Sequence, residues 1–375
     1  MAPTPTHIPD ISECISPAPP WNFGTRHSPA DLNIRGNPKP LAQRGGRTQG
    51  ITVLNSFLHD RGVNYRADMA SPITGFDGCS RLSAHLAFGT VSIRETHHAL
   101  RARQAELKSL PAAQRDKRWL QSMSSFQSRL RWHCHFMQKL ESEPDIEFHN
   151  MNRAYDGIRT EDPADWTDEE RTRYRAWCAG RTGYPFVDAC MRCLHHTGWM
   201  NFRMRSMLVS FASYHLWLHW RPTAIYLARH FLDFEPGIHY SQFQMQSGVT
   251  GINTVRIYNP IKQSQEQDPD GVFIKRWVPE LADVPTRHIH EPWKHLSNEA
   301  SPLFADQTAT TDHAYPPPIV DHGAAYKFAK DRIFAVRKTA AARANAKKVY
   351  LKHGSRRRPT DPPYRGGPED RNGAA

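Results

Sequence analysis

The sequence predicts an all-α fold, and two observations support that prediction. Apolar residues recur at spacings of three and four along much of the chain, which is the period of an amphipathic helix. Short apolar strands alternating with helices and glycine-rich turns are missing, so a nucleotide-binding parallel sheet is not expected. The 375 residues are enough to bury a sizeable core in one large domain or two.

Composition divides the chain into three parts. Residues 1–45 are rich in proline, glycine and polar residues, which predicts an extended or disordered lead-in. Residues 46–305 carry the helical patterns and form the predicted helical domain. Residues 306–375 begin with a proline-rich linker, continue as a basic, solvated helix over 324–351 and end in a flexible basic tail.

Helices are predicted wherever the helical spacing persists, and loops wherever proline, glycine and polar residues gather. The predicted helices of the helical domain are 48–59, 116–140, 184–194, 201–217 and 224–232. The predicted loops are 71–78, 142–144, 179–183 and 234–251.

Charge gives the first indication of a partner. Lys and Arg number 49 against 37 acidic residues, a net charge of +12, which favours nucleic acid because phosphates are neutralised on binding. A solvated basic surface explains the same number equally well. No apolar run is long enough to span a membrane, and the N-terminus lacks a signal-peptide layout, so we expect a cytoplasmic protein. We also expect a monomer.

The six cysteines predict neither a disulfide framework nor a metal site. They are few and scattered, unlike those of small secreted domains. Cys190 and Cys193 form a CxxC, but it lies in a helical pattern and no second pair completes a zinc or iron–sulfur set.

The densest motif is GRTGYPFVDACMRCLHHTGWMNFRMRSMLVSFASYHLWLHWR, residues 180–221. GCSRLSAHLAFGTVS precedes it at 78–92, and RIYNPIKQSQEQDPDGVFIKRWVPELADVP and IHEPW follow at 256–285 and 289–293. In order and spacing these segments closely resemble the flavin-binding domain of DNA photolyases and cryptochromes. The resemblance implies a helical FAD-binding domain without the N-terminal α/β antenna domain of most full-length relatives, so that the flavin itself absorbs the light.

The resemblance also implies the cofactor contacts. Ser80 and Ser83, on a loop that enters a helix, would cradle the pyrophosphate because a helix N-terminus favours anions. Cys79 stands where the family usually has Thr, so one hydroxyl donor is lost. Tyr65 matches a flavin-contacting Tyr, with an ordinary surface Tyr as the alternative. The implied cofactor-binding residues are Tyr65, Cys79, Ser80, Leu82, Ser83, Phe126, Trp132, His133, Arg205, Asp233 and Glu235.

Two arginines of the same motif are implied to have different roles. Arg205 would face the flavin ring, paired with Asp233 or, as the second candidate, Glu235; an ordinary surface ion pair is the alternative. Arg203 lies two residues away on the predicted helix and so points to another side, towards DNA phosphate.

The substrate mouth departs from the family pattern. Trp132 matches the Trp that stacks on a flipped-out pyrimidine dimer, with a core Trp as the alternative. Arg129 replaces the Glu that usually contacts the dimer, and His133 replaces the Arg beside the Trp. Asn201 and Phe202 replace a His–Asn pair. The implied catalytic residues are Trp132, Arg129 and His133, and the implied DNA contacts are Arg129, Trp132 and Arg203.

The segment 236–248 is also rewritten, which leaves Gly237 or His239 facing flavin N5. The family reduces its flavin through a chain of Trp residues. Trp220 matches the middle member, Trp166 the outer one, and the innermost position has only Phe243 nearby. We therefore expect a broken chain, or one rerouted through Tyr240 or Trp177.

Three functions follow. The first is blue-light DNA repair, in which reduced FAD donates an electron to a pyrimidine dimer in double- or single-stranded DNA. The second is a cryptochrome-like photoreceptor or redox sensor without repair, and the third is a flavin-free DNA-binding remnant. The departures from the family pattern lie among the residues implied to contact the substrate, whereas Arg205 and Asp233, implied to contact the flavin, are retained. Flavin binding is therefore a better supported prediction than dimer repair.

Overall fold

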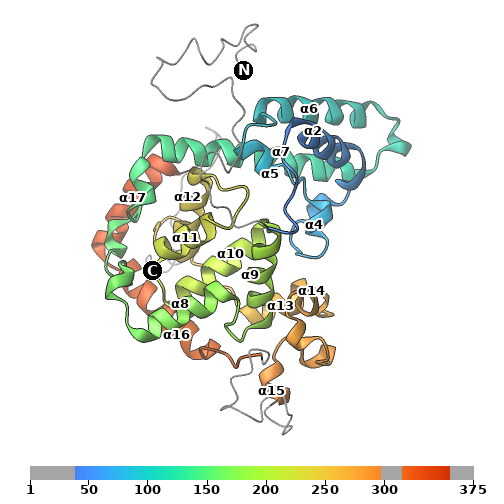
Figure 1. Ribbon diagram of the computed structural model, residues 1–375. Helices are drawn as coiled ribbons and strands as arrows, with labels where there is room; N and C mark the ends of the chain where they lie inside the picture. Colours follow the sequence, from blue (N-terminus) through green and yellow to red (C-terminus); the bar gives the residue numbers. More distant parts are fainter. Residues whose placement is uncertain (1–38, 297–314, 355–375) are drawn as a thin grey trace, which may run out of the picture. The chain divides into compact units, whose positions relative to one another are not determined.

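The computed structural model describes residues 39–296 and 315–354, and these contain helices and turns but no strand (Figure 1). The all-α prediction is therefore confirmed. The chain divides into two compact units, Met1–Pro40 and Leu41–Ala375, and the helices belong to the second. Most of the predicted lead-in, part of the predicted linker and the predicted basic tail lie outside the described residues.

The N-terminal helices surround a small apolar core. It is formed mainly by α2 (Arg47–Ser56), the π-helical turn Phe57–Arg61, α6 (Ile93–Ser109) and α7 (Lys117–Ser142), with the short helices α3 (Tyr65–Asp68), α4 (Gly75–Gly78) and α5 (Ser83–Ala87) between them. The buried residues of this core include Leu54, Phe57, Leu58, Tyr65, Leu82, Leu100, Met123, Phe126 and Trp199. The core brings the loop after α4 against α7 and the segment before α10.

The larger core is built around α9 (Pro185–Thr197), which contacts α8 (Asp168–Ala179), α10 (Phe202–Ser210), α13 (Pro260–Gln267) and α14 (Val272–Trp277). A buried carboxylate fixes the start of α9: Asp188 accepts hydrogen bonds from Thr182 N and Oγ1 and from the Tyr315 hydroxyl. Cys190 and Cys193 are buried on this helix. The GRTGYPFVDA motif thus stabilises the scaffold. A last short helix, α15 (Pro292–Leu296), ends this part of the chain.

The predicted loop over 234–251 is wrong, because its centre is helix α12 (Pro236–Ser247). Pro236 begins the helix, and Gly248 ends it with a left-handed φ of 79°. Tertiary contacts hold it in place: Gln244 bonds to Met151 N and to the carbonyls of Ile146 and His149, each at 2.7 Å. Helix α12 therefore has no clear apolar stripe in the sequence, because some of its buried residues are polar and form hydrogen bonds with other segments.

Other predicted elements differ at their ends. The pattern over 201–217 becomes α10 followed by a π-helical turn, Phe211–His215, and that over 224–232 becomes α11 (Trp220–Ala228). The solvated helix predicted over 324–351 is wrong, because two packed helices are present, α16 (His322–Arg337) and α17 (Ala340–His353). Their side chains Ile333 and Val349 are buried against the body of the domain. No helix in the described part of the chain is both long and apolar enough for a membrane crossing.

Three buried histidines predict acid sensitivity. Burial lowers the pKa of His215 and His219 to about 3 and that of His239 to about 4. Since these values lie below the unfolded value of about 6.5, the histidines fold neutral, and stability is complete above pH ~6.5. Below it, we expect a loss on the order of 1 kcal/mol per pH unit for each histidine. Urea unfolding at pH 7 and pH 5.5 measures this loss.

A matched pair of variants isolates the effect. The His219 Nδ1 atom accepts the amide of Arg221 at the start of α11, so His219→Asn keeps a capping side chain that does not titrate. We expect this variant to lose less stability between pH 7 and pH 5.5 than the wild type. The exposed control His59→Asn should follow the wild type, and equal slopes for all three proteins would contradict the assignment.

Candidate functional site

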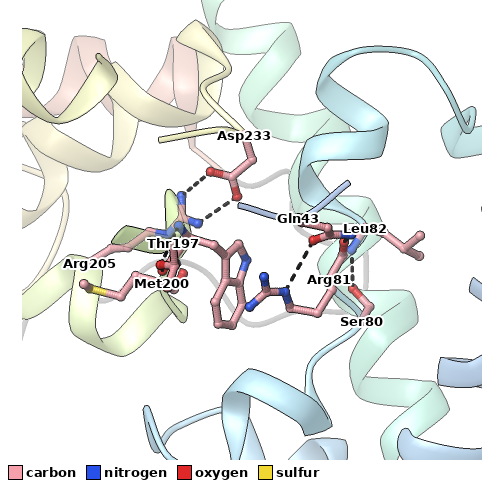
Figure 2. A network of polar contacts seen from close by, with 9 residues as sticks. Gln43, Ser80, Arg81, Leu82, Thr197, Met200, Arg205 and Asp233 are labelled. Atoms are coloured by element: carbon pink, nitrogen blue, oxygen red, sulfur yellow. Dashed lines mark hydrogen bonds and ion pairs between the residues drawn. The ribbon is translucent and has the colours of Figure 1, made fainter. Parts of the chain in front are cut away.

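A buried ion pair lies at the centre of the site (Figure 2). The Arg205 Nη1 and Nη2 atoms of α10 donate to the two carboxylate oxygens of Asp233 at 3.0 and 2.7 Å, and Nε donates to the carbonyl of Met200 at 2.7 Å. The Asp233 side chain is only 3% exposed, whereas that of Arg205 is 26% exposed. The partner of Arg205 is thus Asp233 rather than Glu235, and the geometry is not that of an exposed surface pair.

The ion pair fixes the charge of the carboxylate. Burial alone would raise the pKa of Asp233, but the Arg205 guanidinium and hydrogen bonds from Arg205 and Ser83 outweigh it and hold this pKa below its ordinary value. Asp233 is therefore an anion at neutral pH. The contribution of Ser83 also indicates that the first residue of α5 reaches the ion pair.

The loop from Cys79 to Ser83 is held from behind by an arginine. Arg61 donates to the carbonyls of Asp77 and Ser80, each at 2.6 Å, and to that of Cys79. Burial raises the pKa of the Cys79 thiol to about 12, so it stays neutral. The helix expected after this loop is α5, which begins at Ser83; because it has only five residues, its dipole is small and side chains would have to add positive charge for a bound anion.

The aromatic residues predicted to contact the cofactor lie behind this loop. Tyr65 is 7% exposed, which excludes the surface alternative, and its ring packs edge-on against Phe57 and Phe126. Burial raises the Tyr65 pKa to about 12, and Arg129 lies close enough to its hydroxyl to act against this. Leu82 is buried beside them. Arg129 therefore approaches the cofactor-side residues from α7.

The predicted mouth residues follow one another along α7. Trp132 is 41% exposed, which excludes the core alternative, and its ring stacks on Phe136 with centroids 5.7 Å apart. His133 Nε2 lies 2.9 Å from a carboxylate oxygen of Glu235, so Glu235 joins the mouth to the segment that carries Asp233. Arg203 lies on α10 and is partly buried. Trp132 thus presents a ring to solvent on α7, the same helix whose His133 contacts Glu235 near the ion pair.

The two candidates for the position facing flavin N5, Gly237 and His239, have different surroundings. Gly237 packs against α7: an added Cβ would lie 2.9 Å from the Phe136 carbonyl. His239 is buried and bonds through Nε2 to the carbonyl of Ala224 at 2.9 Å. Arg205 and Asp233 both act on the pKa of His239, which indicates that this side chain lies near the ion pair.

The predicted electron-transfer residues fall into two aromatic groups. Trp220 contacts Tyr240 at 6.4 Å between centroids, and Tyr240 contacts His239 at 5.4 Å, which in turn contacts Phe243 at 4.5 Å. The second group contains Trp166 and Trp177, joined through Tyr174 at 5.0 and 6.5 Å. Trp166, predicted to be the outer member, is only 5% exposed. The first group leads towards the ion pair.

Three residues of the site were missed in the sequence. Phe231 packs under Arg205, with the guanidinium carbon 4.1 Å from the ring centroid. Arg81 and Trp199 pack on each other at 4.0 Å beside the ion pair. Both belong to motifs that carried the resemblance, GCSRLS and TGWM, so an Arg and a Trp at these places were the available signal.

Comparisons with known proteins agree with this geometry. Residues 126–335 match the family model described as the FAD binding domain of DNA photolyase. The deoxyribodipyrimidine photo-lyase of Streptomyces griseus is 35% identical over 291 residues, which cover 76% of this chain and 55% of that protein. Cryptochrome DASH of Gloeobacter violaceus is 30% identical over 284 residues, which cover 75% of this chain and 52% of that protein.

A solved structure shows the same fold. The class III photolyase of Agrobacterium tumefaciens superposes with a TM-score of 0.65 at 29% identity, covering 78% of this chain and 56% of that one. The chain spans about half the length of the curated relatives it matches.

The residues present fit an FAD molecule. The Arg205–Asp233 pair and the Ser80–Ser83 loop approach each other, and a buried guanidinium nitrogen, Arg81 Nη1, has no partner in the protein. An orphaned buried donor beside a serine loop suits a phosphate group.

Proposed function

Because this chain belongs to the DNA photolyase family and binds FAD, we propose that it repairs UV-damaged DNA under blue light. In this reaction reduced FAD, excited by light, would donate an electron to a pyrimidine dimer, and the electron would return to the flavin once the two bonds that join the pyrimidines have broken. The observation that carries the proposal is the exposed ring of Trp132 on α7, linked to the Asp233 segment through the contact between His133 and Glu235. An exposed aromatic ring beside a cofactor site suits the stacking of an extruded base.

The bound flavin supplies light absorption and the electron, and the residues of the chain hold and shield it. Arg205 and Asp233 would hold the flavin with a fixed charge pair, which suits a cofactor whose charge changes with its redox state. His239, near this pair, and Gly237 are the candidates for the residue that would face N5. Tyr65 and Phe126 close the apolar side behind the serine loop. These residues would orient the cofactor and keep water away from it.

This chain must recognise the damaged base differently from relatives that contact the dimer through a Glu carboxylate, because Arg129 stands at that position. Arg129 is exposed on α7 and contacts Met69 and the ring of Phe202. A guanidinium has donors only, so it cannot accept a hydrogen bond from a base and is suited to phosphate or an anionic lesion. The excess of basic residues, a net charge of +12, supports DNA as the partner.

One alternative function has an observation in its favour. Arg129 and His133 both replace residues of the usual dimer-contacting set, and one relative is named a cryptochrome. A flavin photoreceptor or redox sensor without repair would keep the Arg205–Asp233 pair and tolerate these changes. The two functions differ in whether illumination removes dimers.

The test is illumination of the reduced holoprotein with dimer-containing single- and double-stranded oligonucleotides. We expect dimers to disappear in the light only, and Trp132→Ala to abolish most of this loss while keeping its flavin, because the base then loses about 1–3 kcal/mol of stacking. Phe148→Ala, an exposed aromatic control at 46% exposure, should repair normally. DNA binding without any loss of dimers in the light would reject repair and favour the sensor.

A further inference from the structure

We propose that helices α6 and α7 carry a second phosphate-binding surface, outside the flavin site, which holds the backbone of a DNA strand that flanks the damaged base. The inference rests on the proposed function in one respect, that DNA is the partner, and it does not require repair. This α6–α7 basic surface consists of Arg94, His97, His98 and Arg101 on α6 and Arg131 on α7.

The four basic residues of α6 share one side of the helix. Arg94 and Arg101 stand two helical turns apart, a rise of about 10 Å. His97 and His98 lie between them, each three or four residues from either arginine, which is the spacing of neighbours on a helix surface. Another side of α6 is buried in the N-terminal core through residues such as Leu100. The basic stripe is therefore held in place by a packed helix.

Arg131 extends the stripe onto α7, which packs against α6. Burial and three basic neighbours lower the pKa of His97. These neighbours are His98 and Arg101 on its own helix and Arg131 on α7. The guanidinium of Arg131 therefore lies within electrostatic range of the α6 stripe. Arg131 is exposed, and it directly precedes Trp132, whose ring is open to solvent.

No carboxylate of the described residues balances these charges. The three arginines of the surface form no ion pair within 39–296 and 315–354. Both acidic residues of α6 are already paired, Glu95 with Arg47 and Glu106 with Arg103, each at 2.6 Å. The Nδ1 atom of His97 is buried without a hydrogen-bond partner. Like charges gathered in this way repel one another, and a polyanion would remove that cost.

The chemistry of the surface favours a nucleic-acid strand over a lipid membrane. A helix that lies in a membrane interface buries exposed apolar residues, and none of the exposed large apolar side chains of the described residues lies on α6. The planar fork of arginine matches phosphate oxygens. Ser124 and Ser128 are exposed on α7, seven and three residues before Arg131, and their hydroxyls suit further phosphate contacts. Trp132 adds a ring on which a base can stack.

The experiment is a fluorescence-anisotropy titration of the holoprotein with undamaged oligothymidylate, in the dark and at several salt concentrations. We expect Arg101→Gln/Arg131→Gln to weaken binding roughly tenfold at low salt. The slope of log affinity against log salt should flatten by about 1.4, because two phosphate contacts are lost at about 0.7 each. The matched control Lys347→Gln/Lys348→Gln removes the same charge from exposed residues of α17 and should stay within about twofold of the wild type.

The outcomes separate this surface from net charge, from a membrane and from repair. An equal loss of affinity in the α17 control would overturn the proposal, because binding would then follow net charge alone. Unchanged DNA affinity in Arg101→Gln/Arg131→Gln, with lost binding to phosphatidylglycerol vesicles, would overturn it in favour of a membrane. A wild type that shows the expected dark binding but removes no dimers in the light would reject repair and support this inference.

Discussion

Replacing Asp233 by alanine should empty the flavin site and lower the thermal stability of the protein. The change leaves Arg205, three-quarters buried, without its carboxylate partner. Breaking a buried pair in this way costs about 3 kcal/mol. At about 2 °C per kcal/mol for a domain of this size, the melting temperature should fall by roughly 6 °C. Flavin content after purification and a thermal melt of the apoprotein measure the two effects separately.

The control for Asp233→Ala is a surface pair on another helix. Lys262 and Glu266 lie 3.7 Å apart on α13 with side chains 68% and 45% exposed, so Glu266→Ala should change stability by less than about 1 kcal/mol. Asp233→Ala protein that purifies with a full complement of flavin would contradict the proposed clamp.

The Asp233 pair also has a pH signature. The folded pKa of Asp233 lies below its ordinary value, so its contribution is present above pH ~4 and is lost as the pH falls through the folded pKa. The stability difference between wild type and Asp233→Ala should therefore be constant from pH 7 to about 5 and shrink below pH ~4. The acid loss from His215 and His219 occurs in both proteins and cancels in this difference, whereas that from His239 changes with Asp233 because the carboxylate acts on its pKa.

The fold was predictable where helices have an apolar face and clear ends. The pattern over 116–140 became α7, whose start is capped by the Asp116 side chain. Helix α12 was not predictable in this way, because Gln244 and other polar residues are buried in it through contacts with segments nearly a hundred residues away. The packing of α16 and α17 likewise depends on distant partners; α16, for example, packs against the turn Phe211–His215.

The residues of the site that lie in recognisable motifs were predictable from the sequence. The spacing within TGWMNFRMR and FLDFEPG indicated Arg205 and its acidic partner, and the structure pairs Arg205 with Asp233. Arg81 was not predictable, since its surroundings come from three separate segments that supply Gln43, Phe76 and Trp199. A motif identifies residue types in order, whereas an unpaired buried donor is visible only once those segments are folded together.

The second large effect concerns the proposed electron path to the flavin, and it is an expected change in the rate of flavin photoreduction. Trp220 is fully buried, donates from Nε1 to Asn150 at 2.8 Å and contacts Tyr240, which leads through His239 towards the Arg205–Asp233 pair. Burial and the neighbouring Glu147 raise the pKa of Tyr240 to about 12, so its phenol is protonated at neutral pH.

We therefore expect Trp220→Phe and Tyr240→Phe each to reduce the rate of flavin photoreduction by external thiol to a small fraction of the wild-type rate. Phenylalanine keeps an aromatic ring at each position but is much harder to oxidise than either replaced ring. Trp166→Phe should leave the rate close to wild type, because Trp166 belongs to the other aromatic group, with Tyr174 and Trp177. The opposite ranking, a slow Trp166→Phe and a normal Tyr240→Phe, would show that electrons enter through that second group.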